Sequence, residues 1–352
     1  MSEFNPDMLL ILRDVFGMNQ ESLAKACDLS QTYISFLENG QRRPSEEDLT
    51  KIADALGVTP RFLCRDNVRR NFNPVFYRKR LGLAAAEEKR ILGLYNWMKS
   101  DLALLAQRLE FETNFTVPKI EPHEVDGHIE AIARQVRLRW MVPDGPIRNM
   151  TQLMEDAGII IYPLKADKRF DAMIMRSLDG APPIVFINKD TPPDRYRFTL
   201  AHELGHLVMH ETPIGDVDSE ADRFASQFLM PGEQIKPKLE HLTMESLQRL
   251  KMEWKVSMAA LLRRARDLGC LTQGQYEYRI RKMSARGWKT KEPVDLPRET
   301  PTLLNEIVDV FVGQQGSSID SFAQELGVKP WRLGEIYTSC RKDPKERLHL
   351  VS

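Results

Sequence analysis

The sequence predicts a mainly α-helical protein with a small β-sheet, arranged as an N-terminal five-helix domain, an α+β domain and a helical C-terminal module. Three observations carry this prediction. Short helical patterns with capping residues fill residues 7–64, apolar strand-like runs occur between residues 157 and 188, and helical periodicity dominates much of the rest. A chain of 352 residues with 42% apolar content has room for two or three compact domains.

The N-terminal domain breaks into five short helices with turn signals between them. Ser30 caps one helical run, and Ser45 with Asp48 makes a capping-box-like start for another, which stops at Gly57. A Thr-Pro pair then opens a short last helix. Apolar residues recur at helical spacing and would supply a small core, namely Leu23, Ala24, Ile34, Leu37, Leu49, Ile52, Ala53 and Leu56.

This pattern resembles the Cro/repressor-type (XRE) helix-turn-helix family over residues 7–64. The resemblance implies that residues 30–38 form the recognition helix. Asp28 stands where the family usually has a turn glycine, but aspartate tolerates the left-handed conformation better than most residues. The residues that the resemblance directs at base edges are Gln31, Thr32 and Tyr33, and those that it directs at phosphates are Gln20, Asn39, Arg42 and Arg43.

DNA is therefore the expected partner of this domain, and a homodimer is expected because repressor-type domains commonly bind as dimers. The charge of the domain argues for caution. Residues 1–60 hold five Lys/Arg against ten Asp/Glu, a net charge of −5, which is a poor electrostatic match to DNA. Residues 61–80 are basic, with seven Lys/Arg against one Asp. The alternative is a domain that recognises protein.

The most specific signal of the chain is His202-Glu203-Leu204-Gly205-His206 inside a helical pattern. Two imidazoles four residues apart lie on one helix face, close enough to bind one metal ion. Glu203 is turned about one-third of the way around the axis, where it can reach a water bound to that metal. Zinc lowers the pKa of such a water, and a carboxylate can pass its proton to a leaving amine. This chemistry hydrolyses peptide bonds; the alternative is a helix whose two histidines bind no metal.

A catalytic zinc needs three protein ligands and one open position. Residues 219–229 predict a helix, and Glu220 falls on its apolar face whereas Asp222 falls nearly opposite. A carboxylate that points into an apolar core needs a partner, and a metal is the best one available. Glu220 is therefore the predicted third ligand. The alternative is a first-turn glutamate that the helix dipole stabilises.

The His202–His206 motif, followed by the run from Glu220 to Pro231, resembles the ImmA/IrrE family of bacterial zinc metallopeptidases. Members of this family are associated with cutting helix-turn-helix repressors. The resemblance runs from about residue 126 and implies a zincin-like fold with one Zn²⁺ per chain. It implies His202, His206 and Glu220 as metal ligands and Glu203 as the general base. His210 either supports these groups or is a helix-end histidine near the C-terminal dipole.

The strands of the α+β domain are expected close to this motif. Residues 157–163 read as one strand, and residues 170–176 and 183–188 flank the turn signal Asp179-Gly180, which predicts a hairpin. The last strand leads directly into the metal-binding helix. This suggests a sheet edge onto which an extended substrate could add as a further strand.

Four regions follow from these patterns: residues 1–66 form the helix-turn-helix domain, residues 67–125 a basic segment with a long connecting helix and a linker, residues 126–291 the zincin-like metallopeptidase domain, and residues 292–352 a helical C-terminal module. The long helical pattern shows no sustained heptads, so packing on the peptidase is favoured over a dimer seam. The C-terminal module has helical segments near 302–313, 318–326 and 330–338.

The composition of the chain limits which cellular locations and binding partners are expected. The net charge is zero, no apolar run is long enough to span a bilayer, and polar residues interrupt the N-terminal start, so neither a membrane nor a secretory leader is expected. The four cysteines form no Cys-x-x-Cys pair, which suits a reducing cytoplasm.

The sequence thus predicts a cytoplasmic DNA-binding zinc metalloendopeptidase that regulates transcription by cleaving a repressor or related regulatory protein on stress or DNA damage. The alternative is a helix-turn-helix regulator or antitoxin-like protein of a toxin–antitoxin pair, in which the peptidase domain acts as a sensor or scaffold.

Overall fold

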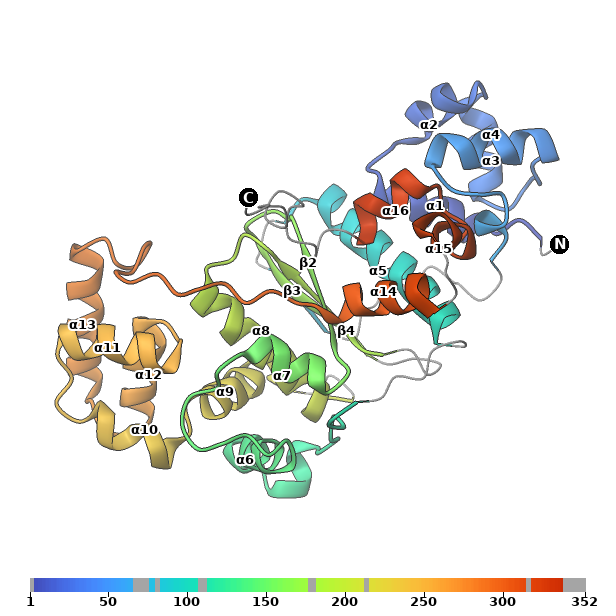
Figure 1. Ribbon diagram of the computed structural model, residues 1–352. Helices are drawn as coiled ribbons and strands as arrows, with labels where there is room; N and C mark the ends of the chain where they lie inside the picture. The colour runs from blue at the N-terminus through green and yellow to red at the C-terminus, as the bar shows by residue number, and fades with distance from the viewer. Residues whose placement is uncertain are drawn as a thin grey trace, which may run out of the picture.

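A four-stranded sheet with helices on both faces organises the computed structural model of the chain (Figure 1). The structure describes residues 3–65, 76–79, 83–106, 113–176, 182–211, 215–314 and 318–337. The strands are β1 (Phe76–Lys79), β2 (Ile160–Leu164), β3 (Phe170–Met175) and β4 (Ile184–Asn188), in the order β1-β3-β4-β2. β3 is antiparallel to β1 and β4, and β2 is parallel to β4. The prediction of a mainly α-helical chain with a small sheet is confirmed.

Side chains of the central strands enter two different cores, because successive strand residues point to opposite faces. Ile161, Ile174 and Val185 belong to the core on one face, and Tyr162, Met173 and Phe186 to the core on the other. Strands β2, β3 and β4 are buried along their whole length. Their near-continuous apolar sequences follow from this two-sided burial.

The first core is shared with α6 (Ile129–Arg139), α7 (Met150–Asp156), α8 (Pro193–Met209), α9 (Val217–Leu229) and the helical group α10 (Gly232–Leu239), α11 (Met244–Trp254), α12 (Met258–Asp267) and α13 (Gln273–Ala285). Figure 1 shows α7 and α8 below the sheet and α10–α13 as a separate cluster at the left. These helices carry the candidate metal centre.

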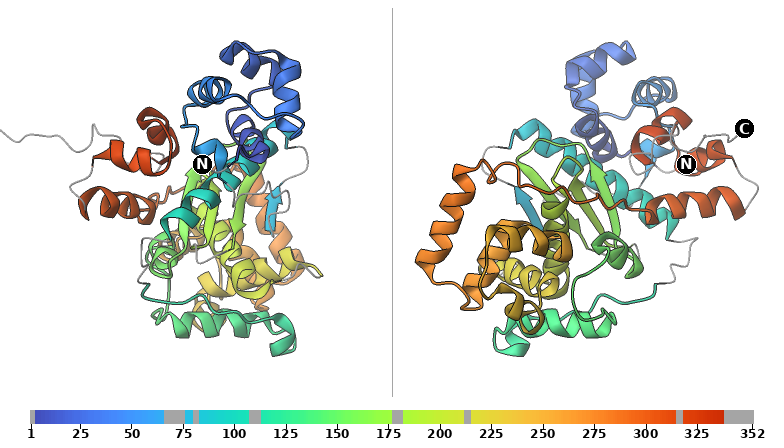
Figure 2. Two further views of the ribbon diagram at one scale, coloured as in Figure 1. Left: turned by 90° about the vertical axis from the view of Figure 1, so that its right-hand side faces the viewer. Right: turned by 60° about the vertical axis from the view of Figure 1, so that its left-hand side comes forward.

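The second core joins the other sheet face to α5 (Ala85–Leu105), to α14 (Leu303–Gln314), α15 (Ile319–Glu325) and α16 (Pro330–Tyr337), and to the N-terminal helices. Both views in Figure 2 show α14–α16 beside the N-terminal domain. Helix α5 packs against α1 and belongs to the core that includes one face of the sheet, and its predicted role in packing rather than as a dimer seam stays a prediction. The boundaries of the four predicted regions stay a prediction.

The N-terminal domain consists of α1 (Pro6–Val15), α2 (Gln20–Cys27), α3 (Gln31–Glu38), α4 (Glu46–Leu56) and the short 3-10 helix η1 (Phe62–Cys64). The side chains of Ser30 and Ser45 accept hydrogen bonds from the backbone of the first helical turns, as the capping patterns predict. Asp28 adopts the left-handed conformation at φ 55°, and Gly57 ends α4 at φ 72°. The five-helix prediction is confirmed, with a 3-10 helix as the fifth element.

The hairpin pairing of β3 with β4 is confirmed, and its predicted turn at Asp179-Gly180 lies outside the described residues. The expectation of a free sheet edge on the strand that leads to the metal-binding helix is wrong. β4 lies between β3 and β2, so ladder hydrogen bonds occupy both of its sides. Sequence order does not reveal this position, because the parallel partner β2 comes earlier in the chain.

A long extended segment crosses the molecule from α13 to α14 (Figure 1). Glu299 anchors it: its carboxylate pairs with the buried Arg197 of α8 and accepts from the backbone amides of Met150 and Thr151, at 3.1 and 2.9 Å, at the start of α7. The negative charge also suits the N-terminal dipole of that helix. The segment therefore ties the C-terminal helices to the metal-centre half of the fold. In the described part of the chain, no helix is long and apolar enough to cross a membrane.

Candidate metal centre and nucleic-acid interface

Helices α8 and α9 pack closely, and Gly205 permits the approach. A Cβ at this position would lie 3.1 Å from Phe224 Cδ1 and 3.3 Å from the Ala221 Cα. The motif helix is buried, with His202 at 0% exposure and His206 at 2%. The first turn of α9 consequently lies over the two imidazoles.

The imidazole nitrogens converge on one point. His202 Nε2 and His206 Nε2 lie 3.0 Å apart, and Asp218 Oδ1 lies 3.6 and 3.4 Å from them. Tetrahedral zinc with bonds of 2.0–2.1 Å separates its ligand atoms by about 3.3 Å. Two imidazoles and one carboxylate at these separations form a donor set that fits a zinc ion.

The protonation states suit metal binding. Burial lowers the pKa of His206 from 6.5 to about 4, so its imidazole is neutral near pH 7. The neutral imidazole is the form that binds a metal. The two imidazoles beside Asp218 hold the pKa of this side chain well below its ordinary value, which keeps it a carboxylate.

A second carboxylate, Asp222, orients the first histidine. Its Oδ1 lies 2.8 Å from His202 Nδ1, on the ring side opposite Nε2. A carboxylate at this nitrogen holds the Nδ1 proton and leaves the Nε2 lone pair for a metal. The apolar face of α9, taken alone, places Asp222 away from the site. The alternating acidic residues from 216 to 222 are the sequence signal that indicates both Asp218 and Asp222.

Glu220 contacts the third histidine of the motif helix. Its Oε2 lies 2.9 Å from His210 Nε2, and His210 Nδ1 lies 3.0 Å from His206 Nδ1. Glu220 as a metal ligand therefore stays a prediction. His210 caps the C-terminus of α8, and burial lowers its pKa. Arg176 donates to the carbonyl oxygens of His206 and His210, which stabilises this helix end.

Glu203 follows His202 on α8 and is 1% exposed. A carboxylate buried next to the two imidazoles suits a proton-transfer role. Its assignment as general base stays a prediction.

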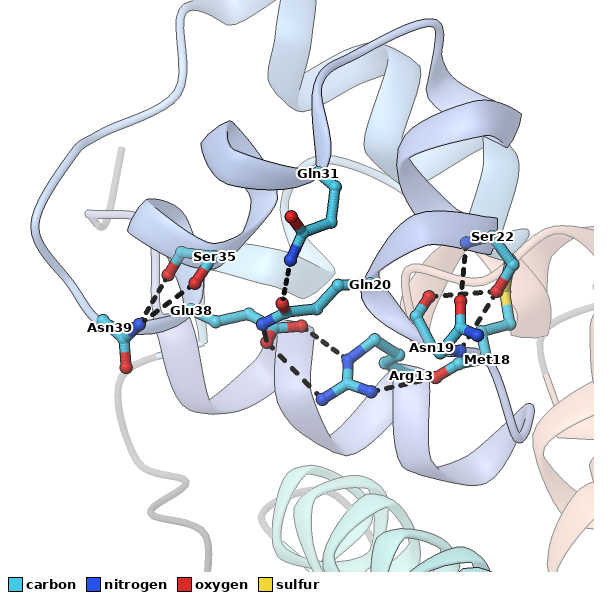
Figure 3. A network of polar contacts seen from close by, with 9 residues as sticks. All are labelled: Arg13, Met18, Asn19, Gln20, Ser22, Gln31, Ser35, Glu38 and Asn39. Carbon is cyan, nitrogen blue, oxygen red and sulfur yellow. Dashed lines mark hydrogen bonds and ion pairs between the residues drawn. The ribbon is translucent and has the colours of Figure 1, made fainter.

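In the N-terminal domain, a polar network joins the start of α2 to α3 (Figure 3). Gln20 Nε2 donates to Glu38 Oε2 at 2.6 Å, and Gln31 Nε2 donates to Gln20 Oε1 at 2.8 Å. Arg13 pairs with Glu38 at 2.6 Å. The network fixes the angle between the two helices of the helix-turn-helix unit. Arg13 and Glu38 are not among the residues predicted from the sequence, because their 25-residue separation carries no local signal.

The predicted DNA-contacting residues divide into two groups. The exposed ones are Gln31, Thr32, Asn39, Arg42 and Arg43, and the half-buried ones are Gln20 and Tyr33. The Tyr33 hydroxyl donates to Asp48 at 3.1 Å, and Arg43 forms an exposed ion pair with Glu3 at 2.8 Å. A phosphate that binds Arg43 has to displace this carboxylate. Much of the basic segment 61–80 lies outside the described residues.

Two regions of the chain match models of known protein families. The model of the IrrE N-terminal-like domain, a peptidase-family domain, matches residues 156–266, and the helix-turn-helix model matches residues 10–63. The chain thus contains a helix-turn-helix domain and an IrrE N-terminal-like domain. The IrrE N-terminal-like match spans α8 and α9, so the candidate metal centre lies inside the residues that it covers.

Two control proteins are similar to short stretches of this chain. The control protein C.BamHI of Bacillus amyloliquefaciens is 52% identical over 47 residues, which cover 13% of this chain and 58% of that protein. The control protein C.MunI of Mycoplasma sp. is 48% identical over 56 residues, which cover 16% of this chain and 76% of that protein. These similarities support a DNA-binding regulator, and the peptidase-family domain supports a metal-dependent peptidase-like fold.

A cleft of about 1300 Å³ opens beside the metal centre of the IrrE-like domain. Ser219 and Asp222 of α9 line it, together with residues of α6, α12 and the segment 289–296. Several of its charged side chains are paired across the walls, as in Glu130–Arg223 and Arg134–Glu233, both at 2.8 Å.

Proposed function

We propose that this protein is a DNA-binding regulator whose IrrE N-terminal-like domain is a zinc-dependent endopeptidase that cleaves a repressor or related regulatory protein. The observation that carries the proposal is the convergence of two buried imidazole nitrogens and a carboxylate oxygen within 3.0–3.6 Å of one another. Burial of imidazoles costs free energy unless their nitrogens have partners. Packing of the two helices alone does not require these side chains, whereas a bound metal would compensate the cost of burying them.

The residues of the chain divide the work as follows. His202, His206 and a first-turn carboxylate of α9 hold the metal. When bound, zinc supplies Lewis-acid polarisation of the attacking water and the scissile carbonyl. Glu203 takes the proton of that water and returns it to the leaving amine. Asp222 is a positioning residue that fixes the tautomer of His202 through the 2.8 Å contact.

Two carboxylates compete for the third metal position. Asp218 is favoured by its distances to both Nε2 atoms, 3.6 and 3.4 Å. Glu220 is favoured by the resemblance to the ImmA/IrrE family and by its less exposed side chain, 31% against 67% for Asp218. Both belong to the first turn of α9.

The substrate class follows from the cleft. A cleft of about 1300 Å³ that Ser219 and Asp222 line accommodates an extended protein segment rather than a single amino acid. The helix-turn-helix domain binds DNA through the exposed residues of α3, as a dimer, and so brings the peptidase near regulators bound at the same promoter. The proposed partners, DNA and a regulatory protein, place this activity in the bacterial cytoplasm. Stress or DNA damage is the proposed trigger.

The decisive experiment compares new protein N-termini in cells that produce the wild type or Glu203→Gln, with and without DNA damage. New ends that appear with the wild type alone support a protease and name its substrate. Glu233→Gln is the matched control, since it makes the same change in the cleft outside the metal centre. New ends that persist in Glu203→Gln would refute the assigned base.

A second candidate function is a regulator in which the peptidase fold is a sensor or scaffold, antitoxin-like in role. Two observations favour it: the similarity to proteins named as control proteins, and the C-terminal helices that contact both the sheet and the helix-turn-helix domain. Identical N-terminal profiles in all conditions, together with unchanged DNA binding in Glu203→Gln, would favour this regulator over the peptidase.

A further inference from the structure

Two turns far apart in the chain share one sequence pattern. Residues 56–63 read Leu-Gly-Val-Thr-Pro-Arg-Phe-Leu, and residues 326–333 read Leu-Gly-Val-Lys-Pro-Trp-Arg-Leu. The pattern Leu-Gly-Val-x-Pro-x-x-Leu is therefore common to both. The first turn follows α4 in the helix-turn-helix domain, and the second follows α15 in the C-terminal module.

The two turns also share one backbone structure. Their glycines, Gly57 and Gly327, have positive φ values of 72° and 61°. In each turn, the valine amide donates to the carbonyl of the alanine five residues earlier, at 2.9 Å in both cases. This is the closing hydrogen bond of a glycine-terminated helix. The sequence repeat is thus a structural repeat.

The two turns pair with each other. Val58 and Val328 form an isolated antiparallel bridge. The Thr59 amide donates to the Gly327 carbonyl at 2.8 Å, and the equivalent Lys329 amide donates to the Gly57 carbonyl at 2.9 Å. Each turn donates one backbone hydrogen bond to the other and accepts the equivalent one from it. The two turns are therefore related by a local two-fold axis that passes between the two valines.

The glycines are needed for this close approach. A Cβ on Gly57 would lie 2.8 Å from side-chain atoms of Trp331 and Arg332, and a Cβ on Gly327 would lie 2.9 Å from Thr59 Oγ1. Val58 and Val328 are 0% and 3% exposed. The pairing is therefore a packed, buried contact.

We propose that residues 56–63 are a self-association surface of the helix-turn-helix domain, and that residues 326–333 cover it as an intramolecular substitute for a second copy. A symmetric homodimer contact is one in which the same patch of both copies meets across a two-fold axis. Here the patch meets a repeat of itself across such an axis. The other occupant of the surface is therefore the same turn of a second chain.

The covering segment is held by three parts of the molecule. The Tyr162 hydroxyl of β2 donates to the Ile336 carbonyl at 2.6 Å, and the Tyr337 hydroxyl donates to the buried Asp101 of α5 at 2.6 Å. Asp101 also pairs with Arg65 at 2.7 Å, and Arg65 donates to the Leu326 carbonyl of the covering segment at 2.8 Å. Because the segment is part of the same chain, its high effective concentration favours the covered state. A change at the sheet that displaces α16 would uncover the dimer surface.

The test uses full-length Val328→Asp, which places a charge in the buried contact of the C-terminal turn and leaves the helix-turn-helix domain unaltered. Sedimentation analysis is expected to show a twofold increase in mass relative to the wild type. Gln324→Asp is the matched control, because it adds the same charge to the exposed side of α15 and should leave the mass unchanged.

Cysteine cross-linking tests the geometry. The pattern of hydrogen bonds makes Val58 and Val328 a non-hydrogen-bonded antiparallel pair, whose Cα atoms lie about 4.5 Å apart, within the reach of a disulfide. Oxidised V58C/V328C is expected to cross-link within one chain and to remain at the wild-type mass. In V58C/V328D, position 58 is expected to cross-link between two chains.

An unchanged mass of folded Val328→Asp would overturn the proposal, as would a dimer that forms no cross-link through position 58. If Val328→Asp does not fold, Gly327→Ala is the milder variant, since it adds one Cβ against Thr59. It is expected to increase the dimer fraction in proportion to protein concentration, and the absence of any increase would contradict the proposal.

Discussion

Removal of the Asp222 carboxylate is the most direct probe of how the metal centre is supported. In Asp222→Ala, the buried His202 loses its partner at Nδ1, 2.8 Å away. The tautomer that carries its proton on Nε2 then becomes accessible, and in that form Nε2 has no lone pair for the metal. Loss of such a carboxylate lowers metal affinity by about 10- to 100-fold, or about 1.4–2.7 kcal/mol. The Asp222 side chain is 27% exposed, so water can replace part of the lost hydrogen bond. We therefore expect a value near the lower end, about tenfold.

The measurement is the zinc dissociation constant, determined by competition with a chromophoric chelator near pH 7. Asp216→Ala is the matched control: it removes the same charge from the same helix, but Asp216 caps the Ser219 amide and does not contact an imidazole. Equal dissociation constants in the two variants would refute the role of Asp222. A wild type that binds no zinc would instead refute the proposed metal centre.

The remaining predictions concern ligand choice, DNA binding and stability. Zinc occupancy by elemental analysis should fall in Asp218→Ala if the observed distances persist in the metal-bound state; a fall in Glu220→Ala alone would assign the third position to Glu220 instead. Arg43→Ala should weaken DNA binding at all sequences alike and reduce the salt slope by about 1, and an unchanged slope would exclude a phosphate contact. Asp101→Ala leaves a buried guanidinium without its carboxylate and should lower the free energy of unfolding by about 3–5 kcal/mol in urea titrations, whereas a loss below 1 kcal/mol would contradict the buried ion pair. Burial raises the pKa of Glu155 from 4.5 to about 7, so the folded state holds this proton longer than the unfolded state. The resulting stability is complete below about pH 4.5 and is lost as the pH rises to about 7, and Glu155→Gln should remove that part of the pH dependence.

The two Leu-Gly-Val-x-Pro turns meet in the core that joins the N-terminal domain to the C-terminal helices. The helix-turn-helix domain, α5 and the C-terminal helices share one hydrophobic core with the inner face of the sheet. The opposite face of the same sheet packs on the helix that carries His202 and His206. A single layer of strands therefore lies between the core that includes the helix-turn-helix domain and the core that includes the helix of His202 and His206.

The sequence by itself determined the local structure of this protein. Capping side chains at Ser30 and Ser45, the glycine at the end of α4 and the apolar runs of β3 and β4 specify their elements, because helix and strand geometry depends on neighbours a few residues away. The shared face of His202 and His206 has the same origin, since residues four apart on a helix always lie side by side.

Only the tertiary structure decided which carboxylates approach those imidazoles. The angle at which α9 crosses α8 depends on the packing of Phe224 against Gly205, and this angle brings Asp218 and Asp222, rather than Glu220, next to the imidazole pair. The interior position of β4 depends likewise on a partner strand from earlier in the chain. The repeat at residues 56–63 and 326–333 is present in the sequence, but its pairing arises because the second core brings both turns to one place, and such long-range packing has no periodic signal along the chain.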